Sequence, residues 1–157
     1  MRKRLVTTSE HSTASFHPGW LELESAAFVE VTSEDKAHPI ECALLGRQEH
    51  GWRAAEPGKQ SLRLIFDEPK VLRRIQLIFE ETEVQRTQEF VLRSSSDAGH
   101  SFREIVRQQW NFSSPTTIRE TEEYKVELSN VTTLELTIVP DIRGGELRAS
   151  LLSFRIA

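Results

Sequence analysis

The sequence predicts an all-β fold, an antiparallel β-sandwich of the jelly-roll type with one short helix. Apolar and polar residues alternate in several short runs, as in Leu62, Leu64 and Phe66, so each strand has one buried and one solvated face. Turn-forming residues such as Asp97 and Gly99 separate these runs. Because each sheet must hide one apolar face, we expect two sheets to stack.

The N-terminal part is predicted to be a partly flexible extension over residues 1–26, before a sandwich domain over 27–157. The basic start at 2–4 is expected to be a solvated tail. After a brief alternation further along the extension, residues 28–32 form the first predicted strand. A short helix is predicted at 39–45, because a proline suits the first helical position and a glycine follows the last.

The other strands are predicted from the same alternation. They lie at 61–69, 72–79, 90–95, 102–106, 124–128, 134–138 and 151–156. Pro140 ends the strand at 134–138, since proline cannot donate to a ladder of backbone hydrogen bonds. The side chains expected to point inward include Leu64, Phe66, Leu77, Phe79, Leu136 and Ile138.

Composition limits the function more than it defines it. A chain of 157 residues suits one domain with its own core. With 20 basic and 24 acidic residues the net charge is -4, which argues against nucleic acid and anionic membranes as partners. The residues after the basic start are too polar for a secretion signal. Cys42 is the only cysteine, which suits a small packing residue in a reducing compartment, so we expect a cytoplasmic protein.

Catalytic and metal-binding motifs are not found in the sequence. The five histidines are scattered at spacings that match no metal motif, and no nucleophile elbow is present. Glu80, Glu81 and Glu83 are too close along one loop to face each other across a cleft, as paired acids must in a glycosidase. We therefore predict neither enzyme activity nor a cofactor.

Several short motifs occur in a characteristic order. They are Ala43-Leu44-Leu45-Gly46, then Gly51-Trp52-Arg53-Ala54, the strand at 60–66, the turn and strands at 90–105, and the last strand at 149–156. This order resembles the discoidin, or coagulation-factor type C, family from about Phe28 to the C-terminus. The resemblance implies a galactose-binding-domain-like jelly roll, a non-catalytic module that presents loops at one end to sugars, lipid head groups or proteins.

The resemblance also carries expectations for single residues. It implies that Trp52 packs in the core. Many sugar-binding relatives hold a structural calcium ion through two acidic residues, and here Leu45 and Ser153 stand at the corresponding places. Because calcium needs several oxygen ligands and a leucine side chain supplies none, we predict no calcium site of that type.

In such a sandwich, three loops would carry the ligand contacts: 34–39, 80–86 and 110–119. Sugar sites combine an aromatic plate with polar groups that bind hydroxyls. We therefore assign the plate and an amide to Trp110, Phe112 and Asn111, and the donors to His38 and Arg86. Each has an alternative role: a core lid for Trp110, a helix-entry residue for His38 and a solvated loop charge for Arg86.

The function predicted from these observations is carbohydrate binding without catalysis. The alternative is an intracellular protein-interaction or scaffold domain, which the polar residues after the basic start and the missing calcium ligands favour.

Overall fold

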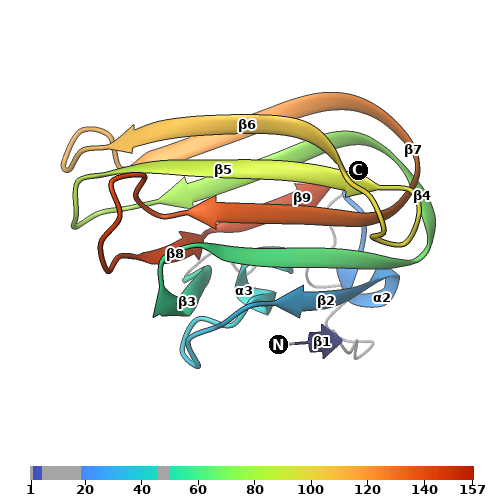
Figure 1. The fold of residues 1–157 in the computed structure, drawn as a ribbon, viewed down its shortest axis with the longest axis horizontal. Coiled ribbons are helices and arrows are strands. Elements are labelled where there is room, and N and C mark those ends of the chain that lie inside the picture. Colours follow the sequence, from blue (N-terminus) through green and yellow to red (C-terminus); the bar gives the residue numbers. More distant parts are fainter. Residues whose placement is uncertain (1, 5–18, 46–49) are drawn as a thin grey trace.

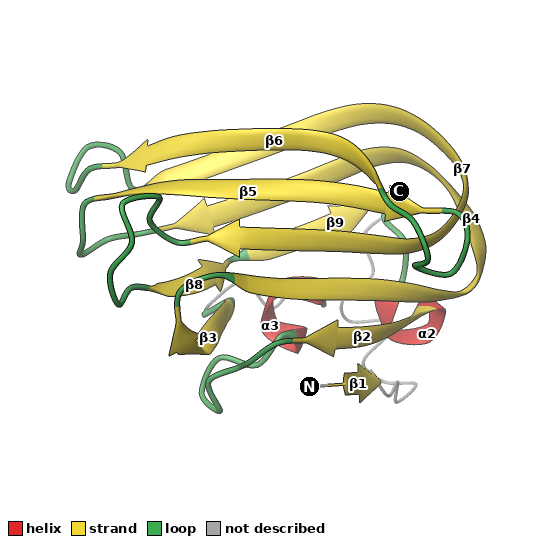
Figure 2. Ribbon diagram, viewed as in Figure 1, coloured by secondary structure: helices red, strands yellow, loops and turns green. Residues whose placement is uncertain are grey.

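The chain folds as an antiparallel β-sandwich, as predicted (Figures 1 and 2). The computed structural model describes residues 2–4, 19–45 and 50–157. Most of the extension that we expected to be flexible, with His11 and His17, lies outside the described residues, as does Gly46. No helix in the described ranges is long and apolar enough to cross a membrane.

The described residues form nine strands and two short helices. In chain order these are β1 (Arg2–Arg4), α2 (Leu23–Ala26), β2 (Ala27–Val31), α3 (Glu41–Leu44), β3 (Trp52–Pro57), β4 (Gln60–Glu80), β5 (Arg86–Ser95), β6 (Arg103–Phe112), β7 (Arg119–Val139), β8 (Arg148–Leu151) and β9 (Ser153–Ile156). All strand pairs are antiparallel.

Two long strands, β4 and β7, run through both layers of the sandwich. Their first and second halves pair with different neighbours: β2 pairs with the start of β4, whereas β9 pairs with its end. Likewise, β5 pairs only with the second half of β7. The pairing of β4 with β7 shifts register between Ile65 and Arg74, where both strands bend (Figure 1).

These long strands correct two pairs of predictions. The strands expected at 61–69 and 72–79 are halves of β4, and those expected at 124–128 and 134–138 are halves of β7. The polar residues between each pair mark a bend at which the chain continues into the other layer. A short polar interruption has the same composition in a bend as in a turn, so the pattern alone predicted separate strands.

The predicted core is confirmed. All six side chains expected to point inward are buried, with Phe66 the most exposed of them at 7%. Phe79 and Phe90 stack across the interior with ring centroids 5.2 Å apart. Burying one such side chain contributes roughly 1.5–3 kcal/mol, so the two inner faces account for the stacking of the layers.

Three smaller predictions are corrected. The helix expected at 39–45 is one turn, α3, because the chain turns at Pro39 and Ile40 before the helix begins. The expected tail at 2–4 is β1, which pairs with β2 and covers backbone groups at that sheet edge. The loop expected at 110–119 is shorter, since residues 110–112 complete β6.

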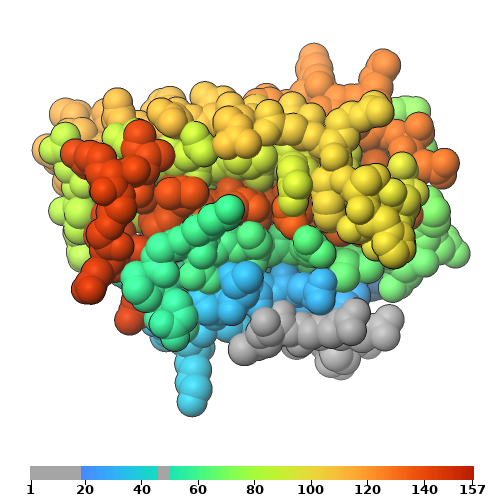
Figure 3. All heavy atoms as spheres, in the orientation of Figure 1, coloured from blue at the N-terminus to red at the C-terminus, as the bar shows by residue number. Residues whose placement is uncertain are grey.

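The two ends of the sandwich differ in construction. At one end, on the left in Figure 1, β4 ends, β5 begins and the small β3–β8 sheet lies beside them; we call this the loop end. Figure 3 shows the red segment between β7 and β8 projecting there. At the other end, on the right, β4 and β7 bend and β5 turns into β6; we call this the bend end.

Candidate functional site

A cavity of about 190 Å³ opens at the loop end; we call it the loop-end pocket. Its walls come from the loop before α3, from β3 and β8, and from the connection between β4 and β5. Its polar side chains include His38, His50, Arg53, Arg86, Arg148 and Ser150. Two of the residues predicted to bind a ligand, His38 and Arg86, therefore lie in one pocket.

His38 is placed by a tight turn that is tied to β3. The backbone N–H of His38 donates to the Asp35 carbonyl at 2.9 Å, and an Asp35 carboxylate oxygen accepts from the Ala37 N–H at 2.8 Å. Asp35 and His38 also exchange backbone hydrogen bonds with Arg53, at 2.8 and 3.1 Å. A short polar side chain that bonds its own backbone two residues on favours such a turn, so the loop holds the imidazole at a fixed position.

The His38 imidazole has unused hydrogen-bonding capacity. Its Nδ1 is buried and has no hydrogen-bond partner among the described residues. The nearest carboxylate oxygen, Asp35 Oδ1, is 3.9 Å away, which is too long for a hydrogen bond. The ring meets that of His50 edge to face at a centroid distance of 5.9 Å. A buried polar atom without a partner is uncommon, and here it belongs to a side chain that lines a pocket.

Arg86 forms the floor of the pocket. It is 2% exposed, and its guanidinium donates to the Arg148 carbonyl at 3.0 Å and to Ser150 Oγ at 3.4 Å. Its Nε lies 3.3 Å from a Glu81 carboxylate oxygen. Burial lowers the pKa of Arg86, while the Glu81 charge acts in the opposite direction. The guanidinium is therefore held from several sides, and it ties β5 to β8.

Trp52 forms a buried wall of the same pocket. It is 1% exposed and its indole N–H donates to the Ser33 carbonyl at 3.0 Å, so the prediction of a core position is confirmed. The outer walls carry two exposed cations, Arg53 and Arg148. The pocket thus combines a fixed floor, an aromatic wall and exposed cations with the acidic residues Glu80, Glu81 and Glu83.

The other three predicted site residues lie in β6, outside the lining of the loop-end pocket. Phe112 is fully buried, with the Arg86 guanidinium 5.5 Å from its ring centroid. Trp110 is half-buried, and its indole N–H is buried without a partner in the described part of the chain. Asn111 is exposed and accepts a hydrogen bond from the Thr87 hydroxyl. Phe112 thus supports the pocket floor, whereas Trp110 and Asn111 are separate from the pocket.

Sequence reasoning missed several polar residues of the pocket, namely His50, Arg53, Arg148 and Ser150. Arg53 and Ser150 are direct partners in the β3–β8 ladder. No local motif marks them, because they are distant in sequence and meet only through strand pairing. Arg53 alternates with buried Trp52 and Ala54 along β3. This alternation is the one signal in the sequence that indicates an outward position for Arg53.

No group of three or more potential metal-ligating side chains gathers in the described ranges. At the two places expected from calcium-binding relatives, Leu45 is half-buried and Ser153 is fully buried. The lack of a calcium site remains a prediction, argued from the leucine side chain at one of these places.

Comparison with known proteins identifies the fold. No protein-family model and no curated protein sequence matches the chain. Solved structures do match it, and three are a pectin-binding carbohydrate-binding module, the family 32 module of Clostridium perfringens NanJ in complex with galactose, and module CBM32-3 from a family 31 glycoside hydrolase of the same species.

Their sequence identities to this chain are 18%, 13% and 14%, with TM-scores of 0.62, 0.61 and 0.62. The alignments cover 84%, 83% and 96% of this chain and 90%, 92% and 98% of the three structures. At such low identity the likeness establishes the fold, which is the galactose-binding-like jelly roll of these modules. The fold expected from the resemblance to the discoidin family is thereby confirmed.

Proposed function

We propose that this chain is a non-catalytic carbohydrate-binding module that holds a sugar in the loop-end pocket. The observation that carries the proposal is the convergence of His38, from the loop before α3, and Arg86, from the start of β5, in one pocket of a fold shared with sugar-binding modules. One of those modules was solved with galactose and another binds pectin. Both kinds of saccharide are therefore suitable probes.

The proposed roles follow from exposure and hydrogen bonding. His38 contacts the sugar directly through the exposed part of its imidazole ring, since 31% of the side-chain surface is exposed although Nδ1 is buried. Arg53 and Arg148 donate from the rim, where both are exposed. Arg86 positions the floor, because its own hydrogen bonds go to Arg148 and Ser150. The exposed side chain of Val84, at 40%, supplies apolar contact to the ring.

The test is a calorimetric titration of the protein with galactose and with pectin fragments. Removing the His38 side chain costs one sugar hydrogen bond and leaves a gap in the wall, so His38→Ala is expected to weaken binding about tenfold, equivalent to about 1.4 kcal/mol. The matched control is Arg73→Ala, since Arg73 is exposed on β4 and does not line the loop-end pocket. The control is expected to bind as the wild type does.

Two results would count against the proposal. The first is no heat of binding with either saccharide at concentrations up to about 10 mM, well above the dissociation constant of roughly 1 mM expected for a weak site. The second is equal binding by wild type and His38→Ala, which would place the sugar elsewhere.

A further inference from the structure

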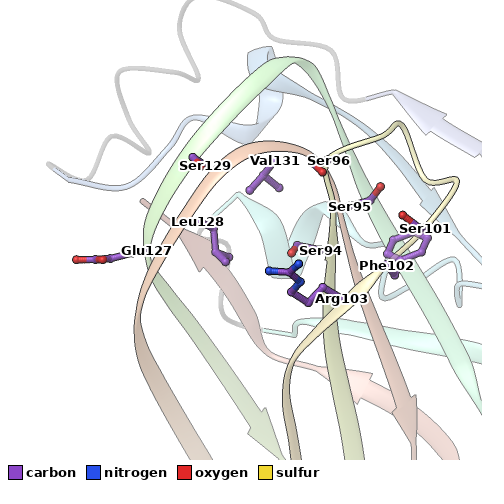
Figure 4. A pocket seen from close by; sticks show the side chains of 10 residues that line it. All are labelled: Ser94, Ser95, Ser96, Ser101, Phe102, Arg103, Glu127, Leu128, Ser129 and Val131. Atoms are coloured by element: carbon purple, nitrogen blue, oxygen red, sulfur yellow. The ribbon is translucent and has the colours of Figure 1, made fainter.

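A second and larger cavity lies at the bend end of the sandwich. Its volume is about 370 Å³, against about 190 Å³ for the loop-end pocket, and it falls in the range of roughly 300–1,000 Å³ that is typical of small-ligand sites. We call it the bend-end cleft. One wall is the turn between β5 and β6 and the other is the bend of β7 (Figure 4). Five of its ten lining residues are serines.

Hydrogen bonds hold both walls in place. In the β5–β6 turn, the Asp97 carboxylate accepts from the Ser95 hydroxyl at 2.6 Å, and from the N–H and the hydroxyl of Ser101 at 2.9 and 2.5 Å. The Thr132 hydroxyl, in the β7 wall, accepts from the Ala98 N–H and donates to the Ser95 carbonyl, both at 3.0 Å. These bonds link the two walls, so a ligand would meet a site that is already formed.

Each wall also contains a strained backbone position. Within the described ranges, Ala98 and Asn130 are the non-glycine residues with positive φ, at 60° and 56°. Asparagine tolerates this conformation, whereas alanine pays roughly 1–2 kcal/mol. Ala98 lies in the β5–β6 turn and Asn130 lies in the β7 bend, so both flank the cleft. Backbone strain of this kind concentrates at ligand-binding sites.

Two charged side chains of the cleft are unpaired within the described part of the chain. Arg103 and Glu127 form no ion pair or side-chain hydrogen bond with any described residue. By contrast, Arg107, on the same strand as Arg103, pairs with Glu104 and Glu89, each at 3.0 Å. Figure 4 shows the Arg103 guanidinium in the middle of the lining side chains and Glu127 at their outer edge. The Arg103 guanidinium is therefore an unpaired donor inside the cleft, whereas the Glu127 carboxylate points away from the other lining side chains (Figure 4).

Apolar surface completes the lining. Leu128 is half-buried and Val131 is buried. Phe102 is half-buried, and the guanidinium groups of Arg93 and Arg63 lie 4.5 and 5.0 Å from its ring centroid. Such cation–π contacts hold the ring in one orientation.

We propose that the bend-end cleft is a second saccharide-binding site. A sugar ring has hydroxyls that both donate and accept, and a C–H face that packs on apolar groups. The cleft matches each of these features: Arg103 donates, the hydroxyls of Ser94, Ser96 and Ser129 can donate and accept, and Leu128 and Phe102 are apolar. The two sites open at opposite ends of the sandwich, so one module could bridge two sugar chains.

The test is an NMR titration in which backbone amide signals are followed as galactose or pectin fragments are added. We expect shifts at Ser101 and Arg103 that are lost in Arg103→Ala. The matched control is Arg73→Ala, because Arg73 is also exposed and does not line the cleft. The Arg73→Ala variant should keep the shifts of the wild type.

The outcome at the cleft is independent of the loop-end pocket, because the signals of the two ends are read separately. In His38→Ala, the shifts at the cleft should persist while those at the loop end are lost. The proposal is overturned if neither saccharide shifts the cleft signals, whatever happens at the loop end. It is also overturned if inorganic phosphate shifts them and saccharides do not, or if Arg103→Ala leaves the sugar-induced shifts unchanged.

Discussion

At the scale of single residues, the most unusual side chain is the buried acid Glu120. It is 0% exposed between the two layers, near the amide of Gln88 at 3.5 Å. Burial raises the pKa of Glu120 to about 8, and the neighbouring charge of Glu122 adds to the shift. The carboxyl group is therefore mostly protonated at neutral pH, which limits the cost of placing an acid between the sheets.

This raised pKa predicts a pH-dependent stability. The unfolded chain releases the Glu120 proton near the ordinary pKa of 4.5, whereas the folded chain keeps it up to about pH 8. The stabilisation is complete below 4.5 and is lost as the pH rises through 8. Glu120→Gln keeps a neutral group, so its free energy of unfolding at pH 9 should exceed that of the wild type by about 2 kcal/mol or more.

Urea denaturation at pH 5 and pH 9 checks this prediction. The matched control is Glu127→Gln, an exposed acid on the same strand, which should follow the wild type at both values. If Glu120→Gln loses stability between pH 5 and pH 9 as steeply as the wild type does, the buried acid is not the cause.

At the scale of elements, the β3–β8 sheet depends on one glycine. Gly51 precedes β3 with φ +63°, and a Cβ atom there would lie 2.5 Å from the Leu151 carbonyl oxygen and 2.8 Å from the Leu152 Cα. Both contacts are with backbone, which cannot rotate away. The close approach of Gly51 to the end of β8 therefore requires a residue without a side chain.

Gly51→Ala is expected to destabilise the fold by more than about 2 kcal/mol, because the clash adds to the strain of positive φ. Gly58→Ala is the control, since Gly58 has φ +83° but nothing within 4 Å of its Cβ position. Its cost should be about 1–2 kcal/mol, from backbone strain alone. Thermal unfolding of the two variants measures the difference, and equal melting temperatures would contradict the role given to the Leu151 contact.

The sequence predicted strands well and their connections less well. Alternation located β2, β4, β5, β6, β7 and β9, since a half-buried strand imposes a period of two, but it missed β3, where a turn was expected around Trp52. It could not show that β4 and β7 are continuous, because a bend between layers and a reversal of the chain use the same polar residues. Of the residues named from the three-loop model, His38 and Arg86 line the loop-end pocket. Arg148 could not be named, because it is 62 residues from Arg86 in sequence and only the folded chain brings its carbonyl to the Arg86 guanidinium.

At the scale of the whole molecule, the sandwich closes around its own apolar core. The C-terminal residues Phe154 and Ile156 are fully buried against the second half of β4. Ser153, at one of the places where calcium-binding relatives have an acid, is part of this packed strand. The fold in this region therefore depends on apolar packing of β9 on β4.

Calcium is accordingly expected to have no effect on stability. The melting temperature in calcium chloride should equal that in a chelator to within about one degree, because Leu45 offers no oxygen ligand. A matched titration with magnesium controls for ionic strength. A rise of several degrees with calcium alone would show that other oxygen atoms form a site.

The proposal on which the others build is that the loop-end pocket binds a sugar. The most direct measurement is a crystal structure of the protein soaked with galactose. The expected result is a sugar ring in the loop-end pocket, with a hydroxyl within hydrogen-bonding distance of the exposed part of the His38 imidazole and the ring above the Arg86 floor. An empty loop-end pocket in a crystal that holds galactose elsewhere on the molecule would contradict it.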